Sequence, residues 1–225
     1  MLKPRYRQIK KQVEKILQLE DREEAFDKLQ AIPMPQLTAP LFSIFYTMDD
    51  LIKFRSTVAM GDLTARLAKN KMEDARIILR RLMWNLNDES GGIGWGSVEA
   101  MGEILKRDKT LAKEFEKILF SYINPEGNFL EHEMLQRGLL WGVGTYLEKC
   151  VSFDTDLAQF ILPFLDSNDP VKRGYAVRAL INMDKKQIKT LPESIISDKN
   201  EIFLFDGWNL LKKMIGKIHS GTIIE

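Results

Sequence analysis

Apolar residues recur along the chain at spacings of three and four residues, which place them on one face of a helix. Four such stripes are clear: Ile9, Val13, Ile16 and Leu17; Ala75, Ile78, Leu82 and Leu86; Leu111, Phe115, Ile118 and Tyr122; and Leu204, Trp208, Leu211 and Ile215. No stretch has the pattern of a strand. The apolar spacing therefore predicts an all-α fold.

Short segments rich in Pro, Gly, Asn and Ser separate the stripes, as expected for antiparallel helical hairpins. Asp169 precedes Pro170, and a carboxylate followed by proline is a typical helix start, since proline needs no hydrogen-bond acceptor there. We expect Asp169 to cap one helix and Ser97 to cap the helix that follows the glycine-rich segment.

The chain also repeats itself. Ser-Thr-Val-Ala-Met-Gly-Asp-Leu at 56–63 matches Ser-Val-Glu-Ala-Met-Gly-Glu-Ile at 97–104, and looser copies occur at 137–144 and 171–180. A period of about forty residues with two helices in each period is typical of an α-solenoid.

The segment 164–180 (FLDSNDPVKRGYAVRAL) resembles the turn and second helix of a HEAT-like repeat: a leucine pair, an Asp-Pro turn, Val-Arg and alanines at helical spacing. The segment 84–105 is similar to a bacterial group of small HEAT-like proteins with no assigned function. The resemblance covers about 40–218 and implies a right-handed solenoid of about four to five helical hairpins. We expect charge-dense residues 1–30 to form a helical cap and 220–225 to be a frayed tail.

Small residues mark the expected contacts between second and first helices: Ala59, Gly61, Ala100, Gly102, Gly142, Gly144, Ala176 and Ala179. Glycine inside a helix costs up to about 1 kcal/mol, and close helix packing would offset that cost.

Composition narrows the possible chemistry. The 225 residues include 33 Lys+Arg and 32 Asp+Glu, so the net charge is +1, which argues against a strongly basic nucleic-acid binder. One cysteine and two histidines exclude an internal disulfide and Cys/His-rich zinc sites. No signal peptide or membrane span is evident, so we expect a cytoplasmic protein. We also expect no bound metal or cofactor.

Two small features have ordinary interpretations. Glu131, His132 and Glu133 are adjacent and cannot converge on one ion from a helix. Cys150 is expected to be a small buried apolar residue rather than a nucleophile.

The glycine-rich loop 90–97 leaves three alternatives open. Its glycines can permit a tight turn while Trp95 fills a groove between repeats. Its amides can bind an anion at the start of the next helix. The loop can also carry a site for a partner or ligand.

Trp84 and Asp88 stand four residues apart, which resembles the HEAT-like alkylpurine DNA glycosylases, where a tryptophan and an aspartate so placed cradle a damaged nucleotide. The resemblance implies that Arg137 would grip a phosphate and that Tyr175 would stand at the third aromatic position. This chain departs from the family in two ways. Asp88 is followed by a glycine-rich loop, and more residues separate Asp88 from Arg137 than in that family.

We expect a noncatalytic module whose concave face, lined by second helices, binds or scaffolds an unidentified protein partner. Its candidate binding residues are Trp84, Asn85, Asn87, Asp88, Glu89, Trp95, Arg137, Trp141 and Arg173. The alternative is an enzyme acting on nucleic acid through Trp84, Asp88, Arg137 and Tyr175.

Overall fold

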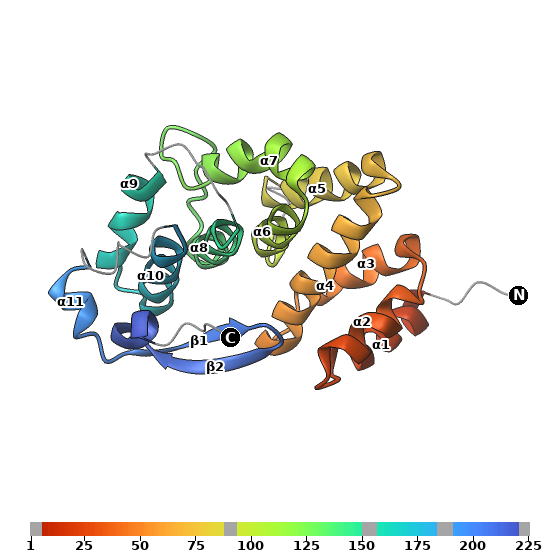
Figure 1. Ribbon diagram of the computed structural model, residues 1–225, viewed down its shortest axis with the longest axis horizontal. Helices are drawn as coiled ribbons and strands as arrows, with labels where there is room; N and C mark the ends of the chain where they lie inside the picture. Colours follow the sequence, from red (N-terminus) through yellow and green to blue (C-terminus); the bar gives the residue numbers. More distant parts are fainter. Residues whose placement is uncertain (1–5, 88–93, 150–156, 184–190, 221–225) are drawn as a thin grey trace, which may run out of the picture.

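The computed structural model describes residues 6–87, 94–149, 157–183 and 191–220 (Figure 1). The elements, in chain order, are α1 (Tyr6–Leu17), α2 (Arg22–Gln30), α3 (Met34–Ile44), α4 (Asp50–Ala68), α5 (Met72–Leu86), α6 (Ser97–Arg107), α7 (Lys109–Ser121), α8 (Glu133–Leu147), α9 (Leu157–Ile161), the 3-10 helix η1 (Leu162–Asp166), α10 (Pro170–Met183), α11 (Glu193–Ile196), strands β1 (Glu201–Asp206) and β2 (Asn209–Met214), and η3 (Ile215–Ser220).

The helices pack in succession: α3 packs against α4, α5 against α4 and α6, α7 against α6, and α9–η1 against α10. The second helices α4, α6, α8 and α10 form an inner row, while α5, α7 and α9 lie outside it (Figure 1). The predicted fold, mostly helical with helices packed in successive pairs, is confirmed. No helix in the described part of the chain is long and apolar enough to cross a membrane.

The small residues lie where the inner helices touch one another. A Cβ atom on Gly102 would lie 2.1 Å from the carbonyl oxygen of Gly142, and one on Gly142 would lie 2.5 Å from that of Val98. On α4, a Cβ at Gly61 would lie 2.5 Å from the Cβ of Glu103. The close contacts therefore join second helices to second helices, not second to first as the sequence suggested.

Of the two predicted helix caps, one is right. Asp169 Oδ1 accepts a hydrogen bond from Val171 N at 2.9 Å, with Pro170 as the first residue of α10. Ser97 does not cap α6, because it is already the first helical residue and Gly96 stands at the cap in a left-handed conformation with φ 75°. Gly96 offers no side-chain acceptor, so α6 begins at a tight turn without a side-chain cap.

The predicted helix through Leu204, Trp208 and Leu211 is wrong. Residues 201–214 instead form an antiparallel hairpin, paired from Glu201 with Met214 to Asp206 with Asn209. Its two-residue turn begins at Gly207, whose φ of 63° suits glycine. Leu204 and Leu211 are cross-strand partners rather than neighbours on a helix.

The hairpin runs along the inner side of the helical row, from α10 toward α4 (Figure 1). At its tip, Trp208 Nε1 donates to Leu19 O at 2.8 Å, and the Trp208 ring packs 5.6 Å from that of Phe26. Buried Arg55 donates to Trp208 O at 2.8 Å and to Leu17 O at 2.8 Å. The hairpin thus ties the last repeat to the N-terminal helices and covers part of the surface expected to be open.

Candidate functional site

Four aromatic rings form a layer between the inner helices and the hairpin. The ring centroid of Phe54 lies 4.9 Å from that of Trp141 and 5.4 Å from that of Phe205, and Trp141 lies 5.2 Å from Tyr175. Phe54 and Tyr175 line one cavity, whereas Trp141 and Phe205 line another. The space beneath the hairpin is therefore two cavities rather than one open groove.

The first, which we call the amino-end cavity, is about 330 Å³ and is lined by the N-terminal halves of α4, α6, α8 and α10. The second, the carboxyl-end cavity, is about 300 Å³ and is lined by the C-terminal halves of α6, α8 and α10, with Val58 from the middle of α4. Both cavities include residues of β1 and β2. The amino-end cavity is the candidate site, because it brings together residues that the sequence had singled out: Trp95, Arg137 and Tyr175.

Glu99 places a carboxyl group in the wall of this cavity. Its side chain lies against α8, where a Cβ on Gly138 would come within 2.5 Å of Glu99 Oε1, so the glycine makes room for it. Burial raises the pKa of Glu99 to about 7, against the lowering effects of backbone hydrogen bonds at Glu99 and Gly96 and of the Lys53 charge. Near neutral pH this carboxyl group can therefore accept or donate a proton.

Arg137 is held at the same wall by an ion pair. Its Nε donates to Asp169 Oδ2 at 2.6 Å, and Asp169 is itself fixed as the cap of α10. Tyr175 donates its hydroxyl to Phe203 O at 3.2 Å, and burial raises its pKa far above the usual range. Arg137 is thus a positioned cation, whereas Tyr175 stays protonated and supports the hairpin.

Trp95 and Lys53 complete the polar and aromatic lining. Lys53 Nζ lies 5.7 Å from the Trp95 ring centroid, within reach of a cation–π interaction. Trp95 also lies 6.3 Å from the ring of Tyr46. The expectation that Trp95 fills a groove is only partly met, because this half-buried ring borders an accessible cavity.

Apolar side chains of the lining remain open to solvent. Met48 is 89% exposed and Phe203 is 52% exposed, and Met134 of α8 is also exposed. Singly exposed apolar residues are common, but three around one cavity indicate a surface suited to an apolar partner.

The glycosylase-like set predicted from the sequence does not assemble as expected. Arg137 and Tyr175 share the amino-end cavity, but Trp84 is 72% exposed on α5 and lines neither cavity. Asp88, Glu89 and residues 90–93 of the glycine-rich loop lie outside the described residues, as does Cys150.

The other candidate binding residues are dispersed. Asn85 belongs to α5, and Asn87 ends that helix with its side chain hydrogen-bonded to Tyr122. Trp141 is 2% exposed and borders the carboxyl-end cavity. Arg173 pairs with Asp198 at 2.8 Å and lines neither cavity.

The adjacent acidic and histidine residues are structural. His132 caps α8 by accepting from Met134 N at 3.2 Å, and Glu133 forms an ion pair with Lys172. Within the described ranges, no three His, Cys, Asp or Glu side chains are grouped to hold a metal ion.

Sequence reasoning missed Glu99, Lys53 and Phe54. A signal for Glu99 was present, because it follows Trp95 by four residues, the same spacing that drew attention to Trp84 and Asp88. Only the stacking of α6 on α8, and of α8 on α10, shows that Trp95 and Glu99, rather than Trp84, lie near Arg137 and Tyr175.

Comparison with known proteins adds no functional assignment. No family model matches the chain, and no curated protein matches it in sequence. A crystal structure of an engineered protein from the Northeast Structural Genomics Consortium is similar over 81% of this chain and 83% of its own, at 15% identity and a TM-score of 0.44. The description of the fold therefore depends on the helix packing given above.

Proposed function

We propose that the protein is a noncatalytic binding module that receives an apolar segment of a protein partner at its amino-end cavity. The observation that carries this proposal is the exposed apolar lining, Met48, Met134 and Phe203, beside a polar wall that contains Glu99 and Arg137. Interfaces combine such apolar anchors with a few placed polar groups. The hairpin moves the proposed site from an open concave face to this cavity.

Affinity capture from native lysate with two matched lysine variants tests the proposal. Phe203→Lys changes the cavity lining, while Ile77→Lys changes a residue on α5 that lines neither cavity and is similarly exposed, at 53% against 52%. We expect a partner captured by the wild type and by Ile77→Lys to be lost with Phe203→Lys. Equal capture by all three would contradict the proposal.

A second candidate function is supported by one specific arrangement. Trp95, Glu99, Arg137 and Tyr175 line a single cavity, and Trp95 and Glu99 have the four-residue spacing of the tryptophan and acidic residue in HEAT-like alkylpurine DNA glycosylases. In its ionised form, Glu99 would stabilise positive charge on an alkylated base, and Arg137 would contact a phosphate.

An assay of base release from alkylated DNA separates the two candidates. For the enzyme, Glu99→Gln should reduce release at least about 100-fold, in the range expected for loss of a positioned ionisable group. Trp84→Ala should leave the rate unchanged. Absence of release by the wild-type protein would remove the enzymatic candidate and leave the binding proposal in place.

A further inference from the structure

The carboxyl-end cavity has a cationic lining that contrasts with the nearly neutral chain. Six basic residues border it: Arg22, Lys106, Arg107, Arg178, Lys213 and Lys217. Three acidic residues oppose them: Glu103, Glu148 and Asp206. Because the whole chain carries a net charge of only +1, this surplus is local.

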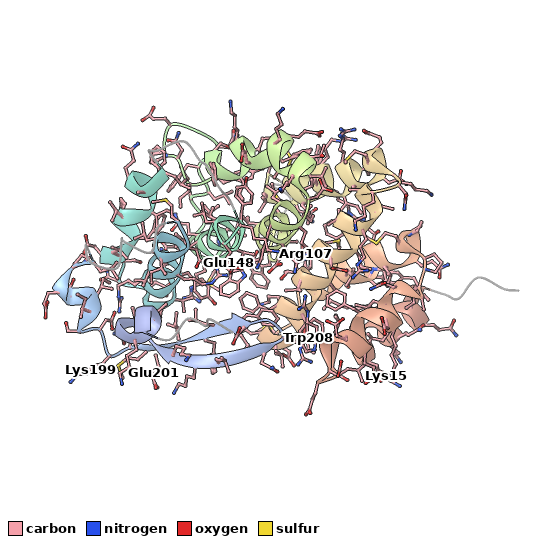
Figure 2. The ribbon with its side chains drawn as sticks, in the orientation of Figure 1. Lys15, Arg107, Glu148, Lys199, Glu201 and Trp208 are labelled. Atoms are coloured by element: carbon pink, nitrogen blue, oxygen red, sulfur yellow. The ribbon has the colours of Figure 1, made fainter. Side chains whose placement is uncertain are left out.

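The ion pairs within the lining leave part of the surplus in place. Arg107 pairs with Glu103, whereas Lys106 and Arg178 share the single carboxylate of Glu148. Figure 2 shows Arg107 and Glu148 on the side of α6 and α8 that faces the hairpin. In these ion pairs, two carboxylates therefore balance three cations.

The ends of the inner helices do not account for all of this charge. Basic residues near a helix C-terminus favourably oppose the helix dipole, which explains Lys106 and Arg107 at the end of α6. Arg22, however, begins α2, and Lys213 belongs to β2. Separate elements thus direct additional positive charge to the same cavity.

Buried donors give an independent indication of a ligand. Trp141 lines the cavity and is almost fully buried, and its indole Nε1–H has no hydrogen-bond acceptor among the described residues. Arg22 also lines the cavity, and its buried Nε–H likewise has no hydrogen-bond acceptor among the described residues. Buried donors without acceptors are unfavourable, and an oxygen-rich anion would satisfy them.

We propose that the carboxyl-end cavity binds a small phosphate-bearing anion, with Arg22, Lys213 and the indole N–H of Trp141 as its contacts. A volume of about 300 Å³ suits a small ligand. The hairpin forms one wall, through Leu204, Phe205 and Lys213, which favours a compact molecule over a nucleic-acid strand. This site is separate from the amino-end cavity and does not depend on the function proposed for it.

Titration of the full-length protein with inorganic pyrophosphate, followed by the tryptophan indole N–H resonances in nitrogen-15 NMR spectra, tests the proposal. We expect a saturable shift of the Trp141 resonance, assigned by its disappearance in Trp141→Phe. Lys213→Gln should raise the Kd about tenfold, as loss of one charged contact predicts.

Lys212→Gln is the matched control, because Lys212 neighbours Lys213 but pairs with Glu201 at 2.6 Å outside the cavity. It should leave the Kd within about twofold of the wild type. No shift of the Trp141 resonance at millimolar pyrophosphate would overturn the proposal. Equal weakening by the two lysine variants, or a tighter response to citrate than to pyrophosphate, would do the same.

Discussion

The two cavities lie at opposite ends of α6, α8 and α10, yet they differ in chemistry. The amino-end cavity combines Trp95 and exposed apolar side chains with a carboxyl group of raised pKa. The carboxyl-end cavity is bordered by twice as many basic as acidic residues. Parallel stacking of α6, α8 and α10 explains the contrast, because it gathers the first turns of these helices at one cavity and their last turns at the other. One repeat scaffold can therefore provide two unlike sites.

The largest expected effect comes from a change that breaks both cavities at once. Trp208→Ala removes the hydrogen bond to Leu19 O and the packing on Phe26 that hold the hairpin tip. We expect the free energy of unfolding to fall by about 4 kcal/mol, as for truncation of a buried tryptophan. Urea denaturation measures this loss. A loss below about 1 kcal/mol would show that the tip is not an anchor.

The next change tests the helix stacking that the cavities share. Gly102→Val introduces atoms where a Cβ alone would lie 2.1 Å from Gly142 O, so α6 and α8 must separate. We expect a loss of about 3 kcal/mol in the free energy of unfolding. Gly207→Asn is the control, because nothing lies within 4 Å of a Cβ there and asparagine tolerates a left-handed conformation. It should cost less than about 1 kcal/mol.

A pH series distinguishes the two cavities, because Glu99 belongs to only one of them. Its pKa is raised from 4.5 to about 7 in the folded protein, so the folded state retains a proton that the unfolded chain releases within that range. The stability contributed by this protonation is present below about pH 4.5 and is lost as the pH rises through about 7. We expect the free energy of unfolding to fall by about 2 kcal/mol from pH 5 to pH 8 on this account.

Glu99→Gln should remove that part of the pH dependence, and urea midpoints measured at intervals of one pH unit would show it. Glu126→Gln, in an exposed turn, should leave the slope unchanged. An identical slope in the wild type and in Glu99→Gln would contradict the raised pKa.

The smallest expected effect concerns a residue outside both cavities. Trp84→Ala removes a ring that is 72% exposed on the outer helix α5. We expect a change in the free energy of unfolding of less than about 0.5 kcal/mol, as for most surface substitutions, and an unchanged pyrophosphate response. A larger loss of stability would show that the ring packs more tightly than its exposure indicates, and a changed pyrophosphate response would extend the carboxyl-end cavity toward the outer face.

Much of the repeat architecture was readable from the chain because its signals are local. Asp169 and Pro170 define a helix start through neighbouring atoms, and the recurring Ala-Met-Gly marks the crowded inner row. The stripe from Leu204 to Ile215 was misleading, because apolar spacing alone did not distinguish a helix from paired strands. Gly207 and contacts with distant residues such as Leu19 and Phe54 favour the hairpin.

The sequence by itself determined that helices form, roughly where they begin and end, and that they recur in pairs, since capping, spacing and small residues act over a few positions. Only the tertiary structure decided that Trp95 and Glu99, rather than Trp84, meet Arg137 and Tyr175, and that a hairpin divides the inner face into two cavities. Those outcomes depend on contacts between residues far apart in the chain, which no local pattern encodes.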